Sequence, residues 1–369
     1  MDPYFPVIRL CLLFSIAVNP HVSILAQDVP WLRSVTQPPI SIPAPARPLP
    51  NLLVDGDNQI IETSQAWLAR RTELIRLWNQ DLGLMPNRPT DKTVITLERE
   101  LFEWGTRELI EYAIEPGLHV QAYVLSPHFI NDTPRAGIVA LHPTTNLTIS
   151  AIAGVAGNTD QHTAVTIAKN GFVVICPRCF LWQNAKDFSD AVAQHHTRHP
   201  GVTGVAKMLY DAQCAVDILE RLPNVDPKRI GAFGHSLGAK EVLYLMAFDD
   251  RIRAGVASEG GIAFESTNWD APWYLGPLAT NISWQRNHHE LLALTIPRPL
   301  LLIGGETGPG AADGTKTWPY ILASSTVYRV FDLPNRIGLI NHGQGHPLPS
   351  KELLKGIEWL INYTSVIAP

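Results

Sequence analysis

Hydrophobic and polar positions repeat along the chain with two periods, which divide it into strands and helices. Short apolar runs are typical of buried strands, and they predict strands at 93–100, 109–114, 118–125, 136–141, 172–176, 230–234, 254–258, 299–303 and 337–340. Apolar residues at helical spacing predict helices at 62–80, 160–169, 205–221, 239–248, 318–325 and 350–363. Strands that alternate with helices indicate an α/β fold with a mostly parallel central sheet and helices on both faces.

The first part of the chain differs from the rest. Arg9 precedes an apolar core at Leu10–Val18, which is too short to span a bilayer, and Ala26 is a small residue suited to a cleavage site. Residues 1–26 are therefore predicted to be a signal peptide, which implies a secreted or periplasmic protein with no stable membrane insertion after its removal. The proline-rich residues 27–56 predict a linker or an arm wrapped on the body, and residues 57–369 form one α/β domain.

Composition narrows the class of protein. Hydrophobic residues make up 46% of the chain and charged residues 17%, which supports a sizeable core and argues against disorder. The formal net charge of −5 provides no basic field for nucleic acid. The sequence gives no indication of the oligomeric state.

The most informative motif is Gly234-His235-Ser236-Leu237-Gly238. It lies between the predicted strand 230–234 and the predicted helix 239–248, which is the setting that a G-x-S-x-G nucleophile turn requires. Such a turn projects the serine hydroxyl above the sheet, and its glycines remove side chains that would collide with the neighbouring strand and helix. Ser236 is therefore the candidate nucleophile.

Roughly residues 60–365 resemble the dienelactone-hydrolase and acetyl-xylan-esterase-like branch of the α/β-hydrolase superfamily. The resemblance rests on the Trp67–Pro86 helix and on three motifs: His142-Pro-Thr-Thr145, Val225-Asp-Pro-Lys-Arg-Ile-Gly-Ala-Phe-Gly-His-Ser-Leu-Gly238 and Gly343-Gln-Gly-His346. It implies an α/β-hydrolase fold and a serine carboxylesterase that uses an acyl-enzyme intermediate and no cofactor. Dienelactone hydrolases proper use a cysteine nucleophile, so Ser236 argues against that particular reaction.

A serine nucleophile needs a base, and the base needs an orienting acid. In α/β-hydrolases these residues follow the serine in the order acid, then histidine. His346, after the flexible Gly-Gln-Gly and before the last helix, is the favoured base, with His342 as the alternative. The oxyanion hole is expected to use the backbone N–H of Leu237 and that of Thr144 or Thr145.

The acid is left open among three carboxylates. Asp313 ranks first and Glu306 follows, because both come after the 299–303 strand, where the acid usually lies. Glu259 is the third candidate, since Ser258-Glu-Gly-Gly261 is similar to glucuronoyl esterases, whose acid can follow the preceding strand. The loop from Gly305 to Asp313 is longer than is usual in the family, so the resemblance does not choose between them.

Other groups of residues have weaker implications. Trp182, Trp269 and Trp273 are candidates for an aromatic wall that binds substrate, although core packing is an equally simple explanation. Cys176 and Cys179 are expected to pack or to form a local disulfide, since no second cysteine pair is present to bind zinc. His195 and His199 could share a helical face, but the glutamate of a metalloprotease motif is missing, so no metal site is predicted.

The sequence thus predicts an exported serine esterase whose substrate is a small-molecule or carbohydrate ester. Two alternatives remain open. A serine peptidase of the prolyl-oligopeptidase type shares the nucleophile turn, although the residues before the domain are too few for a β-propeller. A non-catalytic binding protein could also use a hydrolase scaffold.

Overall fold

The computed structural model describes residues 28–128, 133–308, 310 and 313–365. The predicted signal peptide, residues 1–26, lies outside the described residues. A sheet runs through the molecule with strands in the order β1-β2-β3-β5-β4-β6-β7-β8-β9. Their bounds are β1 Val94–Phe102, β2 Gly105–Glu115, β3 Leu118–Pro127, β4 Arg135–Leu141, β5 Val173–Pro177, β6 Val225–His235, β7 Ile252–Ser258, β8 Leu300–Gly304 and β9 Ile337–Asn341.

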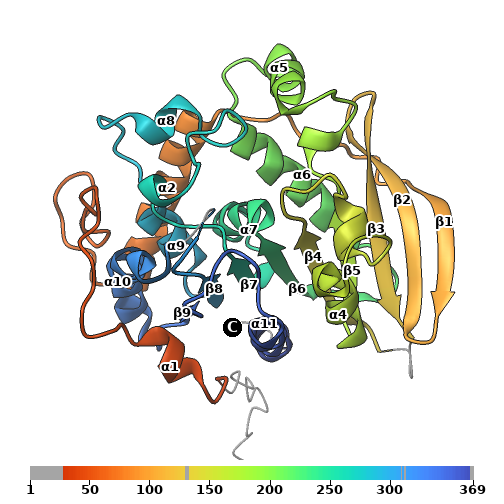
Figure 1. The fold of residues 1–369 in the computed structure, drawn as a ribbon. Helices are drawn as coiled ribbons and strands as arrows, with labels where there is room; N and C mark the ends of the chain where they lie inside the picture. The colour runs from red at the N-terminus through yellow and green to blue at the C-terminus, as the bar shows by residue number, and fades with distance from the viewer. Residues whose placement is uncertain (1–27, 129–132, 309, 311–312, 366–369) are drawn as a thin grey trace, which may run out of the picture.

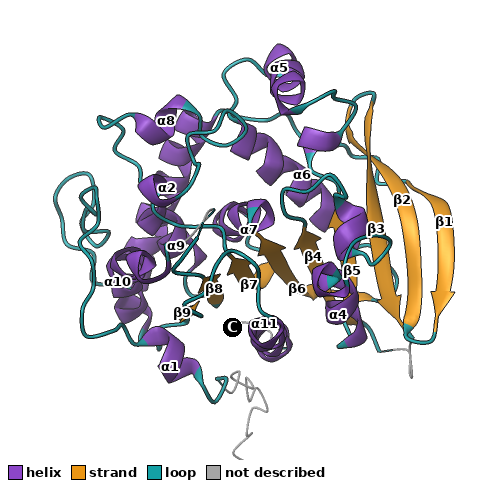
Figure 2. Cartoon of the chain, in the orientation of Figure 1, coloured by secondary structure: helices purple, strands orange, loops and turns teal. Residues whose placement is uncertain are grey.

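The sheet is antiparallel at one side and parallel through its centre. β1, β2 and β3 pair antiparallel, and β3 joins β5 in the same sense. From β5 through β4 to β9 every pairing is parallel, and Figure 2 shows helices on both sides of this part. The prediction of a mostly parallel sheet covered on both faces is confirmed.

Helices cover the two faces of the sheet in separate groups. One face packs against α1 (Leu32–Thr36), α3 (Ile149–Ile152), α4 (Thr163–Lys169) and α11 (Ser350–Thr364). The other packs against α2 (Ser64–Leu82), α6 (Gly204–Leu219), α7 (Leu237–Phe248), α9 (His288–Thr295) and α10 (Trp318–Ser325). The short α5 (Phe188–Arg198) and α8 (Pro277–Thr280) lie at one end of the molecule in Figure 1. No helix among the described residues is long and apolar enough to cross a bilayer.

The proline-rich segment from residue 28 onward is an arm that contacts the body. The Asp28 carboxylate accepts a hydrogen bond from Arg336 at 2.8 Å and one from Tyr363 at 3.0 Å. Farther along, the Arg47 guanidinium lies 5.2 Å from the Phe264 ring centroid. These contacts join the described part of the segment to the residue before β9, to α11 and to the 3₁₀ turn after β7.

Candidate active site

The nucleophile turn is formed where β6 ends and α7 begins. Ser236 has φ 57° and ψ −115°, a left-handed backbone conformation that is strained for a residue with a side chain. A Cβ at Gly234 would lie 2.2 Å from Gly238 O, and one at Gly238 would lie 2.1 Å from Leu141 O. Both glycines are therefore required by close backbone approach, and the predicted strand-turn-helix arrangement is confirmed.

His346 lies beside the serine. Its Nε2 is 2.9 Å from Ser236 Oγ, and both side chains are partly exposed. The loop between β9 and α11 positions this histidine at the carboxyl edge of the parallel strands, where α/β sheets bind ligands. In this geometry an unprotonated Nε2 can accept the serine proton.

Asp313 and Glu306 bind other partners. Asp313 is buried, and its Oδ2 accepts hydrogen bonds from Ile262 N at 2.6 Å and Thr317 Oγ1 at 3.1 Å. Glu306 accepts from the backbone and hydroxyl of Thr315 at 3.0 and 2.8 Å. Asp313 thus fixes the loop after β7, whereas Glu306 fixes its own loop and also accepts a hydrogen bond from Asn341 at the end of β9.

These hydrogen bonds join Asp313 to Ile262 and Thr317, and the role of Asp313 as the orienting acid stays a prediction. A Cβ at Gly310 would lie 2.8 Å from His346 Nδ1, so the backbone of Gly310 runs beside the imidazole.

The two alternative residues of the sequence analysis pair with each other. His342 Nε2 lies 2.5 Å from Glu259 Oε1, and Gly305 N donates to Glu259 Oε2 at 2.9 Å. Gln344 N donates to His342 Nδ1 at 3.2 Å, which leaves the imidazole proton on Nε2, facing Glu259. Burial raises the pKa of Glu259 to about 8 and lowers the pKa of His342, which favours a neutral imidazole over a full ion pair.

His235 is a neighbour that sequence reasoning missed. It fills the variable position of the G-x-S-x-G motif, its ring centroid lies 5.2 Å from that of His346, and its Nδ1 is 3.3 Å from Ser258 Oγ. Burial, and next the nearby His346 and His342, lower the pKa of His235 to about 3. A neutral imidazole therefore flanks the candidate base near neutral pH.

The predicted oxyanion residues lie at the same edge of the sheet. Leu237 is the first residue of α7 and is buried. Leu141, the last residue of β4, is paired with Gly234 of β6, so the loop that carries Thr144 and Thr145 starts beside the nucleophile turn. The roles of these backbone N–H groups stay predictions.

Two of the three tryptophans contribute to an aromatic row. The ring centroids of Trp182 and Phe188 are 4.8 Å apart, and those of Phe188 and Trp273 are 5.3 Å apart. Trp182 and Trp273 are both partly exposed. This row, which we call the aromatic wall, joins the 3₁₀ turn Phe180–Trp182, the start of α5 and the loop before α8.

Trp269 does not belong to the wall. It is fully buried, and its ring centroid is 4.3 Å from that of His288. Lys240 Nζ lies 3.8 Å from the Trp269 ring centroid, and Nζ also donates to Thr267 Oγ1 at 3.2 Å. Core side chains cover the Trp269 ring in this structure, and its role in substrate binding stays a prediction.

Lys240 itself is a second residue that the sequence analysis missed. It lies one helical turn after Ser236 on α7 and is buried, and this burial holds its pKa well below the usual lysine value. Two adjacent charged residues, Lys240 and Glu241, within the largely apolar sequence of this helix were the available signal.

The cysteines and histidines outside the site are buried or hydrogen-bonded within the fold. Cys176, Cys179 and Cys214 are free and buried, so the first two do not form the local disulfide that was considered. His195 Nε2 lies 3.0 Å from Val202 O, and His199 Nε2 lies 2.8 Å from Glu115 Oε2. Within the described ranges, no group of histidine, cysteine or acidic side chains is arranged to hold a metal ion.

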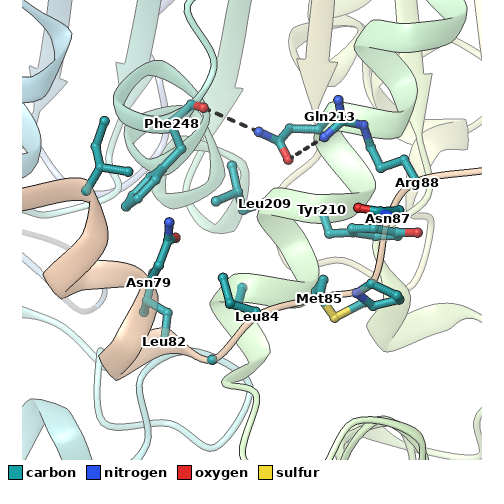
Figure 3. A pocket seen from close by; sticks show the side chains of 14 residues that line it. Asn79, Leu82, Leu84, Met85, Asn87, Arg88, Leu209, Tyr210, Gln213 and Phe248 are labelled. Atoms are coloured by element: carbon teal, nitrogen blue, oxygen red, sulfur yellow. Dashed lines mark hydrogen bonds between the residues drawn. The ribbon is translucent and has the colours of Figure 1, made fainter. Parts of the chain in front are cut away.

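A cavity of about 460 Å³ lies between α2, the segment after it and α6. Figure 3 shows the side-chain amide of Gln213, which donates a hydrogen bond to Phe248 O and accepts one from the Arg88 guanidinium. None of the candidate catalytic residues lines this cavity, so it is separate from the site at Ser236.

Comparisons with known proteins agree with the fold. Residues 140–280 match the model of the dienelactone hydrolase family. No curated protein matches the chain. A glucuronoyl esterase from Solibacter usitatus superimposes with a TM-score of 0.71 at 18% identity, covering 87% of this chain and 99% of its own.

Two further solved structures are similar. A glucuronoyl esterase from Teredinibacter turnerae gives a TM-score of 0.65 at 17% identity, covering 85% of this chain and 88% of its own. A putative acetyl xylan esterase from Bacteroides fragilis gives 0.60 at 15% identity, covering 83% and 84%. The resemblance predicted from the sequence is confirmed: the chain has the α/β-hydrolase fold, and its central part matches the dienelactone hydrolase family.

Proposed function

We propose that this chain is a serine carboxylesterase that acts on an ester of a carbohydrate. The observation that carries the proposal is the 2.9 Å contact between Ser236 Oγ and His346 Nε2 at a strained strand-to-helix turn. A serine in such a turn with an imidazole at hydrogen-bond distance is the arrangement that activates a hydroxyl for attack on an acyl carbon. The reaction needs no cofactor.

The proposed reaction has two halves. Ser236 Oγ attacks the ester carbonyl while His346 Nε2 takes the hydroxyl proton, and the backbone N–H groups of Leu237 and the Thr144 region bind the resulting oxyanion. His346 then returns the proton to the leaving alcohol, which breaks the ester C–O bond and leaves an acyl-serine. A water molecule, deprotonated by the same imidazole, attacks the acyl group and releases the acid.

The nature of the substrate is supported by the similar structures. Two of them are glucuronoyl esterases and one is a putative acetyl xylan esterase, so a carbohydrate ester is the substrate class that we propose. The aromatic wall offers the flat apolar surface that sugar rings and apolar acyl groups pack against. The signal peptide predicted at residues 1–26 supports export to a compartment where polysaccharides are found.

The substrate class can be tested with a panel of compounds. We expect hydrolysis of p-nitrophenyl acetate and of either acetylated xylan or an alkyl ester of glucuronic acid. We expect no cleavage of a proline anilide, because two helices and three antiparallel strands precede β4 in the described part of the chain, where a peptidase of the prolyl-oligopeptidase type has a β-propeller. Cleavage of the anilide alone would replace the esterase with the peptidase.

The carboxylates should differ in their effect on activity. Asn at position 313 can still accept from Ile262 N, so Asp313→Asn is expected to change kcat/KM by less than about tenfold, against the roughly 10⁴-fold loss seen when a triad acid becomes an amide. Glu259→Gln presents an amide to both His342 and Gly305, which are two donors. It is expected to cost more than Asp313→Asn, because the loops that hold His346 depend on that pair.

The measurement is kcat/KM on p-nitrophenyl acetate for both variants, with Glu306→Gln as the matched control. Glu306 is more exposed, and its partners Thr315 and Asn341 can both donate to the oxygen of a glutamine amide, so its variant is expected to remain near wild type. A loss of about 10⁴-fold in Asp313→Asn with the fold intact would restore Asp313 as the orienting acid and contradict the geometry described here.

A further inference from the structure

His142 lies between the nucleophile turn and the aromatic wall. It is the first residue after β4 and is 1% exposed. Cys179 N donates to its Nε2 at 3.1 Å, and its Nδ1 lies 2.8 Å from Pro143 O. Because Nε2 accepts a backbone N–H, the single proton of the neutral ring is on Nδ1 and is donated to Pro143 O. Burial lowers the pKa of His142 to about 4, so the ring stays neutral near neutral pH.

The Nδ1 bond acts on the predicted oxyanion loop. In a trans peptide the carbonyl of one residue and the N–H of the next point in opposite directions. When His142 holds Pro143 O, it therefore also turns the Thr144 N–H away from itself and fixes its direction. The Thr144 N–H is one of the two candidates, with that of Thr145, for the second oxyanion donor of the proposed mechanism.

The other side of the ring acts on the aromatic wall. Cys179, whose N–H is bound by Nε2, immediately precedes the turn Phe180–Trp182. The edge of the imidazole packs against Trp182, with ring centroids 5.1 Å apart. His142 thus contacts both the backbone that starts this turn and the tryptophan that ends it.

We propose that His142 is a positioning residue that orients the Thr144 N–H through Nδ1 and the Trp182 turn through Nε2 and the ring edge. This inference rests on the proposed esterase function. The proposal predicts two separate effects. The Nδ1 hydrogen bond orients an oxyanion donor and therefore affects kcat, whereas the contacts of Nε2 and the ring edge position the aromatic wall and therefore affect KM.

Two variants separate the effects. An Asn amide can replace Nδ1–H as the donor to Pro143 O, and a Gln side-chain oxygen can replace Nε2 as the acceptor of Cys179 N–H. We expect His142→Gln to lower kcat by about tenfold to a hundredfold, somewhat less than the loss of an oxyanion donor, with KM near wild type. We expect His142→Asn to keep kcat within about threefold, as the donor is preserved, and to raise KM for a substrate large enough to reach Trp182.

The assay is the hydrolysis of a p-nitrophenyl ester and of a benzyl ester of glucuronic acid. Rates are expressed per active site titrated with a fluorophosphonate, so unfolded protein does not count. A merely structural role would lower the melting temperature and the number of titrated sites but leave both constants per site unchanged, and that result would overturn the proposal. So would equal changes of kcat in the two variants. Failure of wild-type Ser236 to react with the fluorophosphonate would instead remove the proposed esterase function itself.

One measurement needs no variant. Nitrogen-15 chemical shifts of the His142 ring should show a protonated Nδ1 and a bare Nε2, unchanged between about pH 5 and pH 8 because the pKa is about 4. The opposite tautomer would contradict the proposal even if neither variant folds.

Discussion

Ser236→Ala is expected to reduce ester hydrolysis by a factor on the order of 10³ or more, the largest effect of any substitution considered. The hydroxyl is the group that forms the acyl-enzyme, and its loss leaves only binding and oxyanion stabilisation to act on water attack. The substitution removes only Oγ and keeps Cβ, so the backbone strain at φ 57° is unchanged and thermal unfolding should be nearly the same. The measurement is kcat/KM on p-nitrophenyl acetate.

Ser266→Ala is the matched control. Ser266 is partly exposed, on the 3₁₀ turn Phe264–Ser266, and lies outside the proposed reaction, so its variant should keep wild-type activity. Equal rates for wild type and Ser236→Ala would exclude the serine mechanism and favour the binding-protein alternative.

Lys207→Met is expected to have the largest effect on stability. Lys207 is 0% exposed, and its Nζ lies 2.7 Å from Glu115 Oε1 and 2.6 Å from Asp211 Oδ1. Removing one member of a buried ion pair leaves an uncompensated buried charge, which costs about 3–5 kcal/mol. Here two carboxylates lose their shared cation, so the free energy of unfolding should fall by at least that amount. Urea unfolding measures it.

The loss of stability in Lys207→Met should depend on pH, and the direction of this dependence follows from the pKa shifts of the two buried carboxylates. Burial alone would raise the pKa of Glu115, but the charge and hydrogen bond of Lys207 hold it below its usual value. In wild type, the stability that ionised Glu115 contributes is fully present above the pKa that Glu115 has in the unfolded chain. It is lost as the pH falls through the pKa that Glu115 has in the folded protein. Without Lys207, burial should raise the pKa of Glu115, and it should raise the pKa of Asp211 further, which burial already raises in wild type. The variant then gains stability as pH falls and these groups take up protons.

The difference between wild type and Lys207→Met should therefore narrow from about pH 7 to pH 5. Lys228→Met, at an exposed lysine, is the matched control and should leave the free energy of unfolding nearly unchanged at both pH values. Unfolding free energies for Lys207→Met within about 1 kcal/mol of wild type at pH 7 would show that the buried network is not a source of stability.

Strands, principal helices and the nucleophile turn could be predicted from the sequence because their signals are local. Gly234 and Gly238 are needed by contacts within a few residues or with the adjacent strand, and the apolar run before them is unambiguous. α9 was missed because its first residues, His288, His289 and Glu290, are polar and yet buried. The His288 ring forms hydrogen bonds with Ile262 O and with the Tyr244 hydroxyl. Both partners are distant in the sequence, so the pattern of polar residues does not predict that His288 is buried.

The orienting acid could not be predicted for a related reason. Asp313, Glu306 and Glu259 all follow strands that end at the same edge of the sheet, so their order in the chain does not distinguish them. Their partners are set by donors on other loops, such as Ile262 N for Asp313 and His342 for Glu259. The buried position of Trp269 likewise depends on α9, which the sequence did not predict.

Covalent labelling can show whether His346 activates Ser236 for acyl transfer. The chain would be incubated with a fluorophosphonate, digested and mapped by mass spectrometry, alongside a His346→Ala variant and a His342→Ala control. We predict one adduct per chain on the peptide that contains Ser236, formed far more slowly in His346→Ala than in His342→Ala. An adduct at another residue, no adduct at all, or equal labelling rates in wild type and His346→Ala would contradict the claim.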